Sequence, residues 1–110
     1  MRVNKQNVSP VENPTGILRR TLTWNDELML GHFDMKKGAK IPLHNHRASQ
    51  NGHVLSGKIR FLTEKESFTV GPGDSYNFGP DEKHGAEILE DTILVEAFSP
   101  FRPEYERPLK

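Results

Sequence analysis

The chain has 110 residues, which fits one domain and leaves no room for two. Basic residues number 15 and acidic residues number 15, so the net charge is zero and no positive excess predicts nucleic-acid binding. Cysteine is absent, which excludes a disulfide framework, thiolate metal ligands and a cysteine nucleophile. The apolar fraction of 34% is low for a globular domain, so we expect added stabilisation from a bound metal or a second subunit.

Residues 1–16 are polar and are interrupted by Pro10, Pro14 and Gly16, which predicts an extended N-terminal arm with room for one short strand. No apolar signal-peptide core follows Met1, and no segment has the length needed to span a membrane. We therefore expect a cytoplasmic protein without a membrane partner.

From Ile17 onward, short apolar runs alternate with turn clusters such as Ser56-Gly57. The expected strands cover residues 17–24, 28–35, 54–55, 59–63, 67–70, 76–78, 86–89 and 92–98. No long window has a helical period. The pattern predicts an all-β domain over residues 17–110 and leaves a sandwich and a barrel both open. Residues 99–110 contain Pro100, Pro103 and Pro108, so they are expected to form a proline-rich tail rather than a central strand.

The sharpest local feature is His44-Asn45-His46. Side chains two residues apart on a strand point to the same face, so these two imidazoles can converge on one metal ion. On this spacing alone, a pair of solvent-exposed histidines at a strand end is the alternative.

The residues around this pair have a fixed spacing. Five residues separate Gly38 from His44, three separate His46 from Gln50, and six separate Gln50 from Gly57. Here the sequence resembles the first motif of the cupin superfamily, in which glutamate stands at the position of Gln50. A neutral amide makes the bound metal a stronger Lewis acid at some loss of affinity. A water molecule in place of Gln50 is the alternative.

The second cupin motif is matched at Gly73 and His84, and the sequence departs from it at Gly79, Asp81 and Ile88. The resemblance covers residues 38–105 and implies a single-domain antiparallel jelly-roll barrel, also called a double-stranded β-helix. It also implies one divalent transition metal, with the ligands His44, His46, Gln50 and His84. Nitrogen and oxygen ligands accept zinc, nickel, iron, manganese or copper, so the ligand set does not distinguish among these metals.

A closer resemblance rests on four short segments and three residues after them: His46-Arg47-Ala48-Ser49-Gln50, Val54-Leu55-Ser56-Gly57, His84-Gly85-Ala86 and Phe98-Ser99-Pro100, followed by Arg102, Glu104 and Tyr105. Together they look like the small pectin-degradation cupins of the KdgF type. That resemblance implies that Glu96, Phe98 and Arg102 lie in or near a substrate pocket, although the family has aspartate at the first position. Strand 92–98 is apolar on both faces, so alternation does not decide whether Glu96 points into the barrel or to solvent. An inward Glu96 suits acid–base catalysis, and Arg102 suits binding of a substrate carboxylate unless it is a surface arginine. Tyr76 is expected in the core or the pocket wall.

By this resemblance, we expect a metal-dependent isomerase or lyase that opens or tautomerises the ring of an unsaturated uronate, a small carboxylated sugar. An iron-dependent dioxygenase and a non-enzymatic small-molecule-binding cupin are the alternatives. Apolar residues on both faces of the strands also predict a homodimer.

Overall fold

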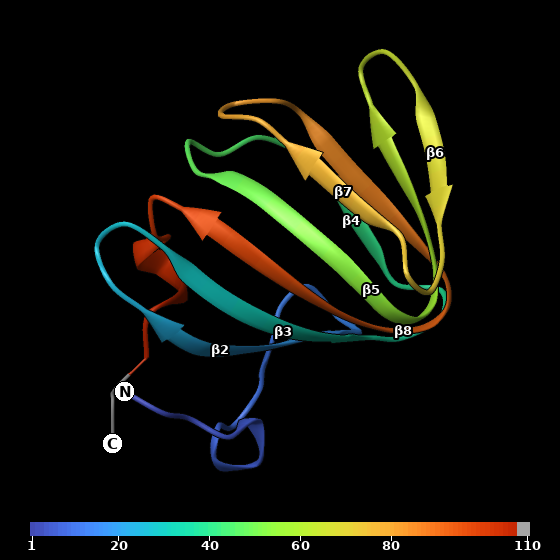
Figure 1. Ribbon diagram of the computed structural model, residues 1–110. Coiled ribbons are helices and arrows are strands. Elements are labelled where there is room, and N and C mark those ends of the chain that lie inside the picture. Colours follow the sequence, from blue (N-terminus) through green and yellow to red (C-terminus); the bar gives the residue numbers. More distant parts are fainter. Residues whose placement is uncertain (108–110) are drawn as a thin grey trace.

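The computed structural model describes residues 1–107 and is built almost wholly from β-strands (Figure 1). Its elements are η1 Lys5–Asn7, β1 Val11–Glu12, β2 Ile17–Trp24, β3 Met29–Met35, β4 Lys40–His44, β5 Ser49–Thr63, β6 Ser67–Val70, β7 Ser75–Phe78, β8 His84–Ser99 and η2 Pro103–Tyr105. The all-β prediction is confirmed. Residues 108–110 of the predicted tail lie outside the described residues. Within residues 1–107, no helix is long and apolar enough to cross a membrane.

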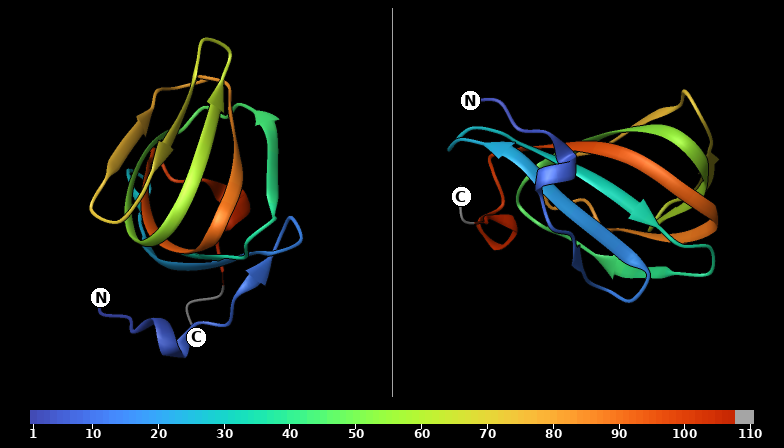
Figure 2. Two further views of the ribbon diagram at one scale, coloured as in Figure 1. Left: turned by 90° about the vertical axis from the view of Figure 1, so that its right-hand side faces the viewer. Right: turned by 90° about the horizontal axis from the view of Figure 1, so that it is seen from below.

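The two longest strands, β5 and β8, pair antiparallel along their whole length and organise the sheet. One half of this pair is flanked by β3 and β7, and the other half is flanked by β4 and β6. Seen end-on, the strands curl around a common interior (Figure 2). They do so without closing, because the described hydrogen-bonded path runs from β1 to β6 and does not return. This is an antiparallel curled sheet of the kind that the resemblance implies, in an open form.

The turn predicted at Ser56-Gly57 is wrong, since β5 continues through these residues by way of register shifts against β8. Such bulges bend a strand and change which residues face inward. Before the bend, Gln50 and Val54 are buried at even positions; after it, Ile59 and Phe61 are buried at odd positions. Gly57 adopts φ of 96°, which favours glycine. A Cβ there would also lie 2.3 Å from a backbone oxygen of β8.

Two further strand boundaries differ from the sequence prediction. The runs 86–89 and 92–98 are parts of the single strand β8. Strand β4 was not predicted, because Pro42 interrupts it and little of it is buried. Proline is tolerated there because β4 pairs with β8 alone and is an edge strand.

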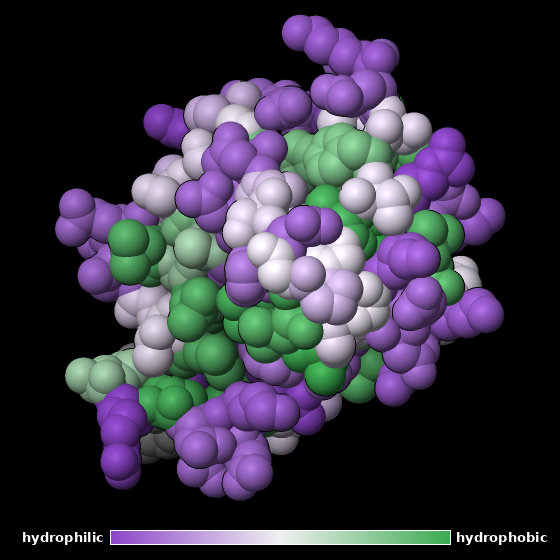
Figure 3. Space-filling model, turned by 45° about the vertical axis from the view of Figure 1, so that its right-hand side comes forward, coloured by the Kyte–Doolittle hydropathy of each residue, from purple (hydrophilic) through white to green (hydrophobic). Residues whose placement is uncertain are grey.

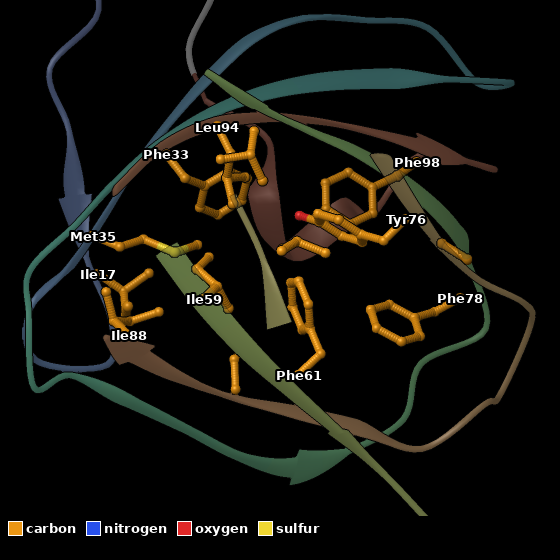
Figure 4. Close-up of a cluster of buried hydrophobic side chains, with 14 of the residues drawn as sticks. Ile17, Phe33, Met35, Ile59, Phe61, Tyr76, Phe78, Ile88, Leu94 and Phe98 are labelled. Atoms are coloured by element: carbon orange, nitrogen blue, oxygen red, sulfur yellow. The ribbon is translucent and has the colours of Figure 1, made fainter. Parts of the chain in front are cut away.

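Buried apolar side chains from most of the strands meet inside the curled sheet (Figure 4). Aromatic rings gather at one end of this core: Phe61 lies 4.3 Å from Tyr76 and 5.3 Å from Phe78, measured between ring centroids. The ring of Phe78 in turn stacks on His84 at 4.3 Å and an interplanar angle of 4°. The aromatic end of the core therefore holds one of the predicted metal ligands in place.

The N-terminal arm lies outside the curled sheet (Figures 1 and 2). Strand β1 pairs with β2, and the backbone carbonyl of Val8 accepts a 3.0 Å hydrogen bond from Nε of Arg20. Large apolar residues also remain exposed, among them Leu28, Leu43 and Leu55. Hydrophobic residues lie in patches between polar ones on the face shown in Figure 3. The homodimer stays a prediction.

Candidate metal centre and adjoining cavity

The three histidines predicted to bind metal come together at one end of the sheet. His44 ends β4, His84 begins β8, and the two residues are paired directly across the strands. His46 lies beyond the end of β4, so the argument from strand alternation was wrong for this residue. A loop nevertheless brings it to the others, and one ligand atom from each ring lies within 4.8 Å of the rest.

All three imidazoles make the same contact through Nδ1. The acceptors are the backbone carbonyl oxygens of Pro42 for His44 at 2.9 Å, of Ala48 for His46 at 2.8 Å and of Glu82 for His84 at 2.8 Å. A carbonyl oxygen can only accept, so each Nδ1 carries a proton, and in the neutral ring Nε2 is then the nitrogen with the lone pair. This is the tautomer in which a histidine binds metal through Nε2.

Burial favours the neutral form of two of the histidines, His46 and His84. It lowers the pKa of His84 to about 4 and also lowers the pKa of His46, where the nearby positive charge of Arg102 acts in the same direction. Neutral imidazole is the form that coordinates a metal.

Gln50 lies between the histidines and Glu96. Its Nε2 donates a 2.6 Å hydrogen bond to the Glu96 carboxylate, so its Oε1 faces Nε2 of His46 at 2.9 Å. With His46 protonated on Nδ1, the lone pair of its Nε2 faces a lone pair of Gln50 Oε1, and the two atoms repel each other. A cation bound by both atoms would remove this repulsion. Three imidazole nitrogens and one amide oxygen fit a divalent transition metal.

Glu96 points into the curled sheet, which strand alternation in the sequence could not decide. It is 5% exposed and lies on the same face of β8 as Leu94 and Phe98, which are also buried. Its Oε2 accepts hydrogen bonds from Gln50 and from the hydroxyl of Tyr76. Burial raises the pKa of Glu96 to about 7, while these two hydrogen bonds act in the opposite direction because they stabilise the carboxylate.

Gly52 lets the Tyr76 hydroxyl reach Glu96. On β5, Gly52 is paired with Glu96 of β8 on one side and with Tyr76 of β7 on the other. A Cβ at Gly52 would lie 2.0 Å from Cζ of Tyr76, so the tyrosine ring occupies the space of the missing side chain. Tyr76 and Phe98 both belong to the buried core (Figure 4). Neither lines the cavity described next, but Tyr76 packs against Phe61 and Phe98 packs against Tyr105, and these two partners do line it.

A cavity of about 300 Å³ adjoins the histidines. Its polar lining includes His44, His84, Gln50 and Glu96, and its apolar wall includes Ile17, Phe33, Met35, Ile41, Ile59 and Phe61. Asn13 and Pro14 of the N-terminal arm complete one side. A larger hollow of about 520 Å³ lies between Met1 and Arg107, but it contains none of the histidines. The smaller cavity is therefore the candidate substrate site.

Arg102 lines this cavity, but it is already paired. Its Nε and Nη2 lie 3.0 and 2.9 Å from the same carboxylate oxygen of Glu104. The guanidinium also lies over the ring of Tyr105, 4.0 Å from the centroid. Tyr105 and Arg19 line the cavity as well, and sequence reasoning missed both. The available signal for Arg19 was its position two residues after Ile17, on the same face of the same strand.

Comparison with known proteins shows the family to which the chain belongs. Residues 31–99 match the cupin domain family. Over 92 residues the chain is 34% identical to the pectin degradation protein KdgF of Dickeya dadantii (strain 3937), covering 82% of this chain and 84% of that protein. The structure of KdgF from Halomonas sp. is similar with a TM-score of 0.89 and 26% identity, over 96% of this chain and 100% of that chain. An RmlC-like cupin from Shewanella frigidimarina NCIMB 400 has a TM-score of 0.89 and 28% identity, over 96% and 95%. The chain therefore belongs to the cupin family and is a relative of the pectin degradation protein KdgF.

Proposed function

We propose that this cupin is a metal-dependent enzyme that opens the ring of a small unsaturated uronate and yields a linear keto sugar acid. The observation that carries the proposal is the position of Glu96, a buried carboxylate beside Gln50 in a cavity that is also lined by two of the histidines and two arginines. The relationship to a pectin degradation protein supports the choice of a uronate, since pectin is built from uronate sugars.

In this proposal His44, His46, His84 and Gln50 hold one divalent metal ion. When bound, such an ion acts as a Lewis acid that polarises an oxygen atom of the substrate. The apolar wall of the cavity excludes water around the sugar ring.

Glu96 is the group that moves the proton. It is the carboxylate of the cavity that has no arginine bonded to it, because Glu104 is paired with Arg102. An unsaturated uronate is a cyclic hemiacetal whose ring oxygen is attached to a carbon–carbon double bond. Glu96 accepts the proton of the anomeric hydroxyl, and the bond from the anomeric carbon to the ring oxygen breaks.

Ring opening leaves an aldehyde at the anomeric carbon, and the bonding electrons pass to the former ring oxygen as an enolate. Return of the same proton to the far carbon of the double bond gives the ketone. No atom and no electron is gained or lost, so the reaction needs no second substrate. The Tyr76 hydroxyl and the Gln50 amide hold the Glu96 carboxylate in position during both transfers.

The test is turnover of an unsaturated galacturonate monosaccharide, followed by loss of the ultraviolet absorbance of its conjugated double bond. We expect activity from metal-loaded protein, loss of activity after chelation, and recovery when divalent metal is restored. Equal rates before and after chelation would overturn the metal dependence. Glu96→Gln should abolish turnover, whereas Glu90→Gln, a change at an exposed position of the same strand, should not.

A further inference from the structure

Arg19 places a second guanidinium group in the cavity, from β2. It belongs to the inward-facing set of this strand, between the buried residues Ile17 and Thr21, and it is 8% exposed. Its partner across the β2–β3 ladder is Phe33, which is part of the apolar core. An arginine at such a position is costly to bury unless its charge has a partner.

Among residues 1–107, Arg19 has no such partner. Its Nε is buried and has no hydrogen-bond acceptor, and no described carboxylate lies within ion-pair distance of its side chain. The guanidinium instead lies over the ring of Tyr105, whose centroid is 3.9 Å from Cζ of Arg19. A ring face attracts a cation but does not accept the in-plane N–H bonds of a guanidinium.

Tyr105 lies against two guanidinium groups, and only one of them is neutralised. Arg102 contacts the same ring at 4.0 Å and is bonded to Glu104 through two nitrogens. The remaining cavity carboxylate, Glu96, accepts its hydrogen bonds from Gln50 and Tyr76. Of the two arginines in the cavity lining, Arg19 is therefore the one without a carboxylate partner among the described residues.

We infer that Arg19 binds the carboxylate of the acid that occupies this cavity, and that Arg102 with Glu104 instead forms part of the wall. The planar guanidinium of Arg19, with a buried Nε–H that has no acceptor, suits a carboxylate that takes two parallel hydrogen bonds. The choice of a uronate as ligand rests on the proposed function. The assignment of the anion site to Arg19 rests on the contacts above.

The test is a comparison of two ligands by calorimetric titration: galacturonate and its uncharged methyl ester. Metal-stripped protein is used first, so that a metal cannot bind the carboxylate, and metal-loaded protein second. We expect the native chain to prefer the acid by about 10- to 100-fold, the range of a charge-assisted contact. Arg19→Gln should remove this preference and leave binding of the ester unchanged.

Arg60→Gln is the matched control, because it removes the same charge from an exposed side chain on β5 that is paired with Glu87. It should leave the preference intact. Arg19→Lys keeps the positive charge but loses the paired N–H donors of the guanidinium, so it should retain only part of the preference for the acid. Arg19→Gln should also raise the melting temperature of the ligand-free protein, whereas a purely structural contact with Tyr105 predicts a fall.

Several outcomes would overturn the inference: no preference for the acid in the native chain, an unchanged preference in Arg19→Gln, or a loss of preference in Arg102→Gln alone. The same experiments distinguish failure of this inference from failure of the proposed function. If unsaturated uronates are not turned over but the acid preference depends on Arg19, the anion site stands and the ring-opening activity does not. If turnover is observed and Arg19→Gln leaves both KM and the acid preference unchanged, the activity stands and the anion site does not.

Discussion

The amide of Gln50 bridges the two halves of the site: its Nε2 donates a 2.6 Å hydrogen bond to Glu96, while its Oε1 lies 2.9 Å from Nε2 of His46. Because Glu96 can only accept when it is ionised, the bond fixes which way the amide points. The oxygen is thereby directed at the histidines. A single side chain thus connects the candidate metal centre to the carboxylate proposed to move the proton.

The first prediction concerns this bridge. Gln50→Glu brings a second carboxylate against Glu96 without a donor between them, so we expect the free energy of unfolding to fall by about 1–3 kcal/mol or more. Adding Glu96→Gln should recover much of this loss, because the amide introduced at position 96 can donate to the carboxylate at position 50. Urea unfolding of the two single variants and the double variant measures the coupling. Simple additivity of the two changes would contradict the predicted bond.

The second prediction concerns the Tyr76 hydroxyl. Tyr76→Phe keeps the ring packing and removes one donor to the buried Glu96, so we expect a loss of about 1–3 kcal/mol in stability and a roughly tenfold lower kcat. Ser75→Ala is the control, because it removes a hydroxyl of the same strand that contacts the exposed His53. Thermal unfolding and initial rates are the measurements. If Tyr76→Phe had the native kcat, the Tyr76 hydroxyl would have no role in the reaction.

The third prediction concerns the space occupied by the Tyr76 ring. Gly52→Ala puts a methyl group 2.0 Å from Cζ of Tyr76, so the ring must move and we expect about 1–3 kcal/mol of destabilisation from overpacking. Gly71→Ala is the matched control, since the nearest atom to its new methyl group is 3.8 Å away. Denaturant midpoints of both variants check the prediction. Equal stability of the two would show that Tyr76 does not need the space above Gly52.

The fourth prediction concerns the metal. Because the ligands converge only in the folded chain, a metal at a hundredfold excess over its Kd should stabilise the protein by about 2.7 kcal/mol, and a chelator should remove this gain. His84→Ala should abolish the gain. His53→Ala should not, because His53 is exposed and Nδ1 of its ring contacts Ser75. Elemental analysis and thermal unfolding of the His84→Ala and His53→Ala variants test this prediction. If His84→Ala retained the metal, His84 would not be a ligand.

Much of the fold could be predicted from local pattern, and the error at Ser56-Gly57 has a clear physical cause. Short apolar runs and turn residues correctly indicated an all-β chain, since both are local properties. The continuation of β5 through Gly57 could not be predicted, because a bulge and a hairpin turn use the same kind of residue. Only pairing with β8 distinguishes the two.

For the site, the sequence by itself determined which residues are candidate donors, because His44, His46, Gln50 and the distant His84 stand at the ligand positions of the two motifs that it resembles. The side-chain direction of Glu96 was decided only by tertiary structure, since its strand is apolar on both faces. The bond from Gln50 to Glu96 joins residues 46 positions apart, and it depends on the register of β5 against β8. The position of Arg19 in the cavity likewise depends on how β2 packs against its neighbours. The sequence therefore indicated the candidate donors, whereas the pairing of distant strands decided which other side chains lie beside them.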